Sequence, residues 1–290
     1  MNCFNSDTYL KEAINSIYAQ TYKNWEIIFW DNQSTDKSAK IAKSYNNKLK
    51  YFLAKKYTGL CEARALAMGK TNGKFIAFLD CDDLWLPTKL EKQVKLFEDK
   101  NVGLVYSNTI TIGLNGIEKK GLNNNYRGYC FKQLLGNYVL QMPSVIIRKR
   151  AIQNINFDKS LKLCCDFDLF LQIAYDNKID FVEDFVTKRR IQKNSLTKTD
   201  IGFNFEKEFK IIMHKFSKLY KGFFDLFGNE IKKSEASLVF QRAVYEFKNV
   251  DSVKARVTIR KYIFINWQYF VFYIVTFIPT KLVLKILQWK

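Results

Sequence analysis

The sequence predicts an α/β fold with a mostly parallel central sheet flanked by helices, followed by a helical tail. Three observations support this fold class. In the first hundred residues, short apolar runs alternate with segments of helical periodicity. Acid-rich turns follow two of these runs directly, as expected beyond the carboxyl ends of parallel strands. Beyond about Gly202 the strand pattern ends. We therefore divide the chain into an α/β domain, residues 1–200, and a helical region, residues 201–290.

The N-terminal elements alternate in the order that a parallel sheet requires. Helical spacing starts after Ser6, a suitable N-cap, and stops near Thr21. The expected elements that follow are a strand at 25–30, a helix at 41–45, a strand at 49–53, a helix at 61–70 and a strand at 74–79. Strands joined by helices of this kind form right-handed parallel crossovers.

Less regular elements complete the α/β domain. The expected elements are a helix at 89–99, strands at 102–106 and 144–148, a helix at 166–175, and two short strands at 179–182 and 186–190. Helical spacing alone continues from about residue 202 to the end. We find no internal repeat.

Composition excludes several classes of protein. With 48% hydrophobic and 16% aromatic residues, the chain can bury a core and is not disordered. Its single histidine, His214, rules out a multi-histidine zinc site. The six cysteines form no C-x-x-C pair, so we expect reduced thiols in a cytosolic compartment.

Part of the net charge of +19 is concentrated near the C-terminus. After Asp251 the chain has no acid but seven bases, Lys254, Arg256, Arg260, Lys261, Lys281, Lys285 and Lys290. Among these bases runs an uncharged, aromatic segment at 262–278, a pattern typical of attachment to an anionic membrane surface. The segment is short for a membrane span and contains Asn266 and Gln268, so we favour an interfacial position over a span. A buried helix is the alternative.

Three carboxylates lie within four residues directly after the strand at 74–79. Asp80, Asp82 and Asp83 would repel one another, and a divalent cation such as Mn²⁺ or Mg²⁺ would relieve that repulsion. The alternative is that these acids simply precede the N-terminus of the next helix, where the helix dipole favours negative charge. A second acidic turn begins at Asp31, at another strand end, and could line the same cleft.

Several motifs between about residues 2 and 110 together resemble the family 2 glycosyltransferases, which are inverting enzymes of the GT-A fold that use nucleotide-sugar donors. The matching pieces keep the family's order and spacing. They are residues 9–22, the segment WDNQSTD at 30–36, Gly59 with Ala63 and Arg64, and FLDCDD at 78–83 followed by Pro87. No single piece is decisive, but the set resembles the bacterial enzymes that build surface glycans.

The resemblance implies donor-binding roles for three residues outside the acidic turn at 80–83. Phe4-Asn5 matches an aromatic-Asn pair that precedes the first helix, and we expect Asn5 to bind the donor. Asp31 matches the acid that recognises the base and ribose, and Arg64 matches the cation near the diphosphate. As alternatives, Asp31 caps a turn and Arg64 is a solvated helix residue.

The resemblance also assigns the acidic turn as the family's D-x-D region. Asp82 would hold the metal, whose task is to stabilise negative charge on the departing diphosphate. Asp80 would face the ribose, and Asp83 would contribute to nucleotide-sugar binding.

A further motif implies the catalytic base. Residues 164–171 resemble the family's Glu-Asp pair before an apolar helix, with Asp166 in the Asp position and Cys165 in place of the Glu. Asp166 would remove the acceptor hydroxyl proton; the alternative is a helix N-terminal acid. Gln192 stands where many relatives have a histidine, which in some of them contributes to the metal or diphosphate site. We expect this contact to be lost, or to be replaced by Arg189 or Arg190 on the phosphates. The alternative is that these two bases form a solvated strand end.

Relatives begin with an apolar, β-branched strand that this sequence lacks before Asn5. We therefore expect the first strand to be absent. Because that strand is central in a doubly wound sheet, its loss would expose two unpaired edges and remove part of the nucleotide pocket. Either the functional protein starts upstream of Met1 or this form is impaired.

The sequence thus predicts a glycosyltransferase that moves a sugar, with inversion, from a nucleotide-sugar donor, expected to be UDP-linked, to a hydroxyl of a glycan or lipid-linked glycan. The expected cofactor is Mn²⁺ or Mg²⁺. We expect the protein in the cytoplasm, peripheral on the inner face of the cell membrane. One alternative is an impaired membrane-bound scaffold of the same fold. The other, a nucleic-acid-binding protein, suits the pI of 9.5 but no recognised motif, so we expect no nucleic-acid partner.

Overall fold

The computed structural model describes residues 1–122, 124–192 and 203–283. The chain forms two compact units, Met1–Leu134 with Val139–Lys193, and Leu135–Tyr138 with Asn194–Lys290. The expected domain boundary at residue 200 and the bases Lys285 and Lys290 lie outside the described residues.

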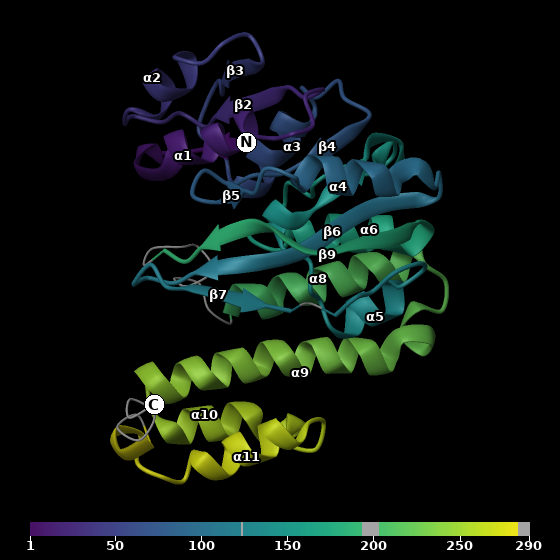
Figure 1. Ribbon diagram of the computed structural model, residues 1–290. Helices are drawn as coiled ribbons and strands as arrows, with labels where there is room; N and C mark the ends of the chain where they lie inside the picture. Colours follow the sequence, from purple (N-terminus) through teal and green to yellow (C-terminus); the bar gives the residue numbers. More distant parts are fainter. Residues whose placement is uncertain (123, 193–202, 284–290) are drawn as a thin grey trace. The chain divides into compact units, whose positions relative to one another are not determined.

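The first unit begins with a three-stranded parallel sheet. β2 (Ile27–Asp31) lies between β1 (Asn2–Cys3) and β3 (Leu49–Leu53). Three helices accompany these strands (Figure 1): α1 (Asp7–Tyr18), α2 (Ser38–Lys43) and α3 (Leu60–Met68). All five residues of β2 are buried, which explains its continuous apolar sequence.

A first strand is present at Asn2–Cys3, which corrects the expectation from the sequence that it is absent. Asn2 and Cys3 pair in parallel with the end of β2, and Trp30 N–H donates to the Met1 carbonyl at 2.9 Å. This pairing leads the chain to Asn5 at the carboxyl end of β2.

A second sheet of six strands has the order β4-β8-β6-β9-β5, with β7 paired to β6. The strands are β4 (Phe75–Ala77), β5 (Leu84–Trp85), β6 (Val102–Ile112), β7 (Glu118–Gly121), β8 (Ile146–Arg148) and β9 (Lys178–Arg190). β6 and β9 run parallel, whereas the other pairs are antiparallel. Parallel pairing therefore holds throughout the first sheet and at the centre of the second.

β9 is one strand where the sequence predicts two. The exposed acids Glu183 and Asp184 interrupt the apolar pattern, but the pairing with β6 continues past them through shifts of register. Such irregularities absorb polar residues without ending a strand. The prediction of two separate strands was wrong for this reason.

Helices and short 3₁₀ turns complete the first unit. They are α4 (Lys89–Lys95), η1 (Leu96–Glu98), η2 (Met142–Ser144), η3 (Lys149–Ile152) and α6 (Cys165–Asp176), while α5 (Phe131–Gly136) bridges the division between the units. The buried Gln20 ties the end of α1 to the β5–α4 segment. Its amide donates to the Leu86 carbonyl at 2.9 Å and accepts from Leu90 N–H at 3.0 Å.

The second unit is helical over its described residues. Its elements are α8 (Phe203–Leu219), α9 (Phe223–Asn249), α10 (Ser252–Ile259), η4 (Arg260–Tyr262) and α11 (Trp267–Val275). Asp251 caps α10 by accepting from Lys254 N–H, and Asn266 caps α11 in the same way. None of the helices in the described ranges has the length and apolar character needed to cross a membrane.

Candidate active site

The turn after β2 is organised by a buried carboxylate. Asp31 is 0% exposed, and its two oxygens accept hydrogen bonds from Ser34 N–H at 2.8 Å and from the Tyr51 hydroxyl at 2.6 Å. Burial, together with the Asp31 carboxylate, raises the pKa of Tyr51, which keeps its hydroxyl a donor. These contacts match the alternative considered for Asp31, that it shapes the turn.

Asn5 fastens the chain after β1 to the same turn. Its side-chain oxygen accepts from Thr35 N–H at 2.8 Å, and its own N–H donates to the Ser34 hydroxyl at 3.1 Å. Asn5 has a φ of 46°, in the left-handed region that asparagine tolerates better than most residues. Asn5 therefore lies at the turn that Asp31 organises.

Arg64 of α3 is the centre of a second group of site residues. Its guanidinium donates to both carboxylate oxygens of Asp80, at 3.1 and 3.4 Å, and to the Cys165 sulfur at 4.0 Å. The Arg64 side chain is only 11% exposed, so it is not a solvated helix residue. Asp166, in the first turn of α6, lies in the same charged surroundings.

Burial raises the pKa of Asp166, while the positive charge of Arg64 acts in the opposite direction. A carboxylate with a raised pKa is a stronger base than an ordinary aspartate, which suits proton removal near neutral pH. The predicted base thus lies beside the predicted diphosphate ligand Arg64, on a different element.

The rest of the acidic turn is held by the end of β9. Burial and the neighbouring charge of Asp80 raise the pKa of Asp82, whose carboxylate also accepts a hydrogen bond from Gln192. Asp83 is buried and accepts from Arg190 N–H at 2.8 Å. Burial, followed by the charges of Asp80 and Asp82, raises the pKa of Asp83 to about 8.

Arg190 is engaged within the chain. Its guanidinium donates to the Asp82 carbonyl at 3.1 Å and to Glu12 at 3.1 Å, and it stacks 3.9 Å from the centre of the Tyr9 ring. These contacts fix the acidic turn against α1 and use Arg190 as an anchor. The hypothesis that Arg190 reaches donor phosphates gains no support from this geometry.

The two groups of site residues meet at β1. The Cys81 thiol, between Asp80 and Asp82, donates to the Asn2 carbonyl at 3.4 Å. β1 also pairs with the end of β2, where Asp31 lies. One short strand therefore connects the turn that holds Asn5 with the acidic turn.

The acidic turn has the donor atoms that a divalent cation prefers. In the ranges that the structure describes, no three His, Cys, Asp or Glu side chains converge as a complete metal site. However, Mg²⁺ and Mn²⁺ are commonly held by one or two carboxylates, with substrate phosphates filling the shell. The mutual repulsion of Asp80 and Asp82, visible in the raised pKa of Asp82, fits this kind of site.

Two features of the site are not predicted from the sequence, namely Tyr51 and the hydrogen bond from Gln192 to Asp82. Tyr51 lies opposite Phe29 in the parallel register of β2 and β3, so only the register shows that its hydroxyl can reach Asp31. Gln192 stands where many relatives have a histidine, but its partner Asp82 lies far away in the sequence, so no local pattern indicates the contact.

The chain combines a parallel α/β layer with an acidic turn beside a buried arginine. The chain belongs to glycosyl transferase family 2, because residues 1–155, more than half of its length, match that family's sequence model. It is a family 2 glycosyltransferase of the GT-A fold.

Sequence relatives support the assignment. An uncharacterized glycosyltransferase of Methanocaldococcus jannaschii is 34% identical over 64% of this chain and 67% of that protein. The Escherichia coli UDP-Glc:alpha-D-GlcNAc-diphosphoundecaprenol beta-1,3-glucosyltransferase WfgD is 29% identical over 68% of this chain and 78% of that protein.

Solved structures share the fold. The crystal structure of S. aureus TarS 1–349 in complex with UDP-GlcNAc has a TM-score of 0.63 at 20% identity, covering 87% of this chain and 74% of that chain. The Pyrobaculum calidifontis mannosyltransferase PcManGT, in complex with GDP-Man and Mn²⁺, has a TM-score of 0.61 at 13% identity, covering 95% and 82%.

Proposed function

We propose that this glycosyltransferase transfers a sugar, with inversion, from a UDP-sugar to a hydroxyl of a lipid-linked glycan, assisted by a divalent metal. The observation that carries the proposal is the grouping of Arg64 on α3 with Asp80 and Asp82 in the turn after β4 and Asp166 at the start of α6. A diphosphate, a metal and a deprotonating group are the three requirements of this reaction, and this group supplies residues for each.

The donor half of the site has two parts. Arg64 offers a planar, bidentate cation suited to diphosphate oxygens. The turn held by Asn5 and Asp31 would receive the base and ribose, with Asp80 facing the ribose and Asp83 supporting the turn. A UDP donor is favoured because WfgD is named as a UDP-glucose enzyme and TarS was solved with UDP-GlcNAc.

Asp82 would hold a Mn²⁺ or Mg²⁺ ion, which when bound supplies positive charge for the departing diphosphate. The PcManGT complex contains Mn²⁺, which supports this assignment. The Asp80 carboxylate forms an ion pair with Arg64. This ion pair lowers the net negative charge of the turn before the donor binds.

In the proposed displacement, Asp166 accepts the proton of the acceptor hydroxyl as its oxygen forms a bond to the anomeric carbon. The bond from that carbon to the diphosphate oxygen breaks in the same step, so the sugar inverts and no covalent glycosyl-enzyme forms. Arg64 stabilises the charge that develops on the diphosphate.

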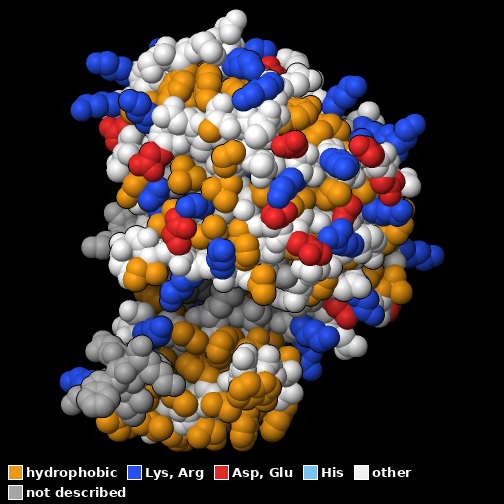
Figure 2. All heavy atoms as spheres, in the orientation of Figure 1, with side chains coloured by type: hydrophobic (Ala, Val, Ile, Leu, Met, Phe, Trp, Pro, Cys, Tyr) orange, Lys and Arg blue, Asp and Glu red, His pale blue; other side chains and the backbone are white. Residues whose placement is uncertain are grey.

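We further propose that the helical region at 201–290 attaches the enzyme to the inner face of the cell membrane, where lipid-linked acceptors lie. α11 and its flanks expose large apolar side chains, which we call the α11 apolar surface: Phe264, Trp267, Phe270, Val271, Ile274, Phe277 and Ile278. Within α11, Trp267, Phe270, Val271 and Ile274 recur at helical spacing on one face. Figure 2 shows apolar side chains gathered in this part of the molecule. The exposed bases Arg260, Lys261 and Lys281 flank it.

The catalytic proposal is tested with single variants and a matched control. UDP-sugars are first screened by thermal shift with Mn²⁺ present, because a ligand that binds the folded state raises its melting temperature. Transfer to a diphosphoundecaprenol-linked sugar is then measured for Asp166→Asn, Asp82→Asn and the control Asp184→Asn, whose side chain is 58% exposed.

We expect Asp166→Asn to lower kcat by about 10²- to 10⁴-fold while donor binding is retained. Asp82→Asn should abolish the Mn²⁺-dependent part of the thermal shift, and Asp184→Asn should behave as the unaltered protein. Product NMR should show inverted anomeric configuration. Wild-type kcat in Asp166→Asn would refute the assigned base.

A further inference from the structure

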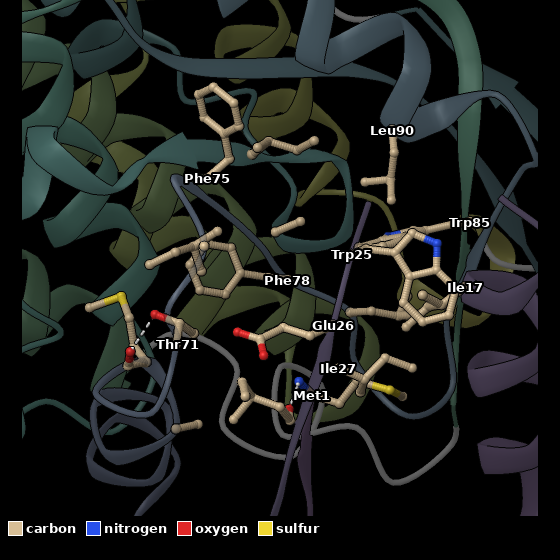
Figure 3. Close-up of a pocket in the computed structure, with 18 of the residues that line it drawn as sticks. Met1, Ile17, Trp25, Glu26, Ile27, Thr71, Phe75, Phe78, Trp85 and Leu90 are labelled. Atoms are coloured by element: carbon tan, nitrogen blue, oxygen red, sulfur yellow. Dashed lines mark hydrogen bonds between the residues drawn. The ribbon is translucent and has the colours of Figure 1, made fainter. Parts of the chain in front are cut away.

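The first unit contains a cavity of about 750 Å³ beside the candidate active site. Figure 3 shows Trp25, Phe75 and Trp85 among the side chains around it. Because Arg64 and Asp80 also line this cavity, it is part of the site already described. Another feature of the first unit takes no part in the proposed chemistry, namely the hairpin that joins β6 to β7.

The hairpin turn at 113–117 has a backbone fixed by its own hydrogen bonds. Gly113 N–H donates to the Ile117 carbonyl, and Gly116 N–H donates to the Gly113 carbonyl, both at 2.9 Å. The Asn115 side chain accepts from Ile117 N–H at 3.2 Å. Gly116 has a φ of 77°, a left-handed conformation that glycine adopts without strain. Two glycines and an asparagine therefore supply what the turn requires.

The other two residues of the turn are large, apolar and exposed. Leu114 is 56% exposed and Ile117 is 57% exposed. Turns are normally built from Gly, Asn, Asp, Pro and Ser, so neither aliphatic side chain is needed to form this one. We call Leu114 and Ile117 the hairpin tip. Two apolar side chains held in solvent on a fixed turn are suited to contact with an apolar partner.

Positive charge lies behind the hairpin tip. Lys119 and Lys120 are exposed on β7, and the exposed Arg189 lies in the same row across the sheet as Lys119. Glu118 is closer to the tip, but it forms an ion pair with Lys188 at 2.5 Å. The acid is therefore neutralised, and the remaining charge behind the tip is positive.

The spacing between the apolar tip and these bases matches the layers of a lipid surface. A strand advances about 3.3 Å per residue, so Lys119 and Lys120 lie about 7 to 10 Å behind Ile117. Protein segments at a bilayer surface insert apolar side chains about 5 to 10 Å into the boundary between headgroups and acyl chains. Lysine side chains at that level reach the anionic headgroups.

The hairpin tip also lies at the catalytic end of the second sheet. Ile112 at the end of β6 is in register with Arg190 at the end of β9. Figure 1 shows both strand arrows pointing toward the end of the sheet where the hairpin turn lies. Ile191 N–H donates to the Ile112 carbonyl at 2.9 Å, and the next residue, Gln192, donates to Asp82. The turn therefore begins beside the segment that contacts the acidic turn.

We propose that the hairpin tip inserts into an anionic phospholipid bilayer and so brings the catalytic end of the first unit to the membrane surface. Leu114 and Ile117 enter the acyl boundary, while Lys119, Lys120 and Arg189 contact the lipid phosphates. This contact is additional to the α11 apolar surface, which belongs to the other unit. It rests on the proposed function in one respect, that a lipid-linked acceptor lies in the same membrane surface.

A dye attached at the turn reports on the hairpin separately from α11. The six native thiols are buried, so a thiol at an exposed position is labelled in preference to them. Leu114→Cys and the matched control Leu122→Cys are each labelled with nitrobenzoxadiazole in the full chain. Leu122 is 83% exposed but follows the end of β7 that is remote from the turn. The membrane is a phosphatidylglycerol vesicle with brominated acyl chains.

We expect the dye at position 114 to shift its emission to shorter wavelength and to be quenched about twofold or more, because it enters the acyl boundary. The dye at position 122 should do neither. Replacing both tip residues, by Leu114→Ser with Ile117→Ser, should weaken vesicle binding by about tenfold. Equal spectra at the two positions in protein that co-sediments with the vesicles would overturn the proposal. Absence of co-sedimentation would overturn it as well.

The same samples distinguish this proposal from the proposed function. Neither the emission nor the co-sedimentation requires a sugar donor. A quenched dye in a protein that transfers no sugar would support the hairpin contact and count against the proposed function, whereas an active enzyme with an unquenched dye would do the reverse. Quenching that occurs only after a diphosphoundecaprenol-linked sugar is added would overturn insertion into the bilayer, since the tip would then bind the acceptor chain.

Discussion

Asp83 is an acid whose folded surroundings oppose its charge. Its pKa of about 8 in the folded protein compares with about 4 in an unfolded chain. Between these values the unfolded chain has released the proton that the folded chain keeps. The free energy of unfolding therefore falls as pH rises from about 4 to 8, and the Asp83 contribution is constant above that.

Asp83→Asn should remove this contribution. The amide can still accept from Arg190 N–H, so the turn keeps its contact. We expect the variant to be more stable at pH 8 by about 1 to 3 kcal/mol and to show a flatter pH profile in urea unfolding. The free energy of unfolding should still fall slightly with pH in the variant, because the pKa values of Asp82 and Asp166 are also raised. An unchanged profile would contradict the environment described for Asp83.

Tyr51 supports Asp31 through a single hydroxyl, and Tyr51→Phe tests that support. The variant leaves one oxygen of a fully buried carboxylate without its donor. We expect a loss of about 1 to 3 kcal/mol in the free energy of unfolding and weaker UDP binding. Tyr45→Phe is the matched control, because its hydroxyl bonds to Asn15 at the surface and should matter by less than about 0.5 kcal/mol. Equal losses in the two variants would argue against this role.

At the scale of elements, β6 passes α6 at a position where only glycine fits. A Cβ on Gly103 would lie 2.6 Å from Cβ of Asn177, the residue that ends α6. Gly103→Ala should therefore cost about 1 to 3 kcal/mol in urea unfolding. Gly121→Ala on β7 is the control, since no atom lies within 4 Å of its added Cβ. Equal stability of the two variants would contradict close packing of Gly103 against Asn177.

The sequence predicted the N-terminal elements well because periodicity is local. The strand at 49–53 matches β3 at both ends, and the first helix matches α1 within a few residues. β5 and β7 were missed, since β5 is two residues long and β7 is fully exposed and charged. The antiparallel pairs of the second sheet were also missed, because pairing depends on contacts between distant segments.

The contacts of the candidate site residues could be predicted from the sequence only in small part. The positions of Asp31 and Asp80 after strands follow from the apolar runs that precede them, but the contacts of Asn5 with the Asp31 turn and of Arg64 with Asp80 do not. The anchoring of Asp83 by Arg190 joins segments more than a hundred residues apart, so no local pattern could show it.

At the scale of the whole molecule, a charge of +19 and the α11 apolar surface should act together at a membrane. We expect co-sedimentation with phosphatidylglycerol vesicles, weak binding to neutral vesicles, and loss of binding as salt is raised. Trp267→Ala should weaken binding by roughly tenfold. Tyr129→Ala, an exposed aromatic in the first unit, should have no effect. Equal binding to neutral vesicles would refute the electrostatic part.

The burial of all six cysteines gives the protein built-in chemical probes. Cys3, Cys61, Cys81 and Cys165 lie on the elements that carry the site. An alkylating reagent can modify such thiols only when the surrounding structure opens, so the rate of modification measures that opening. Mass spectrometry of alkylated peptides, with and without UDP-sugar, would therefore show which parts of the site close on the donor, without any added label.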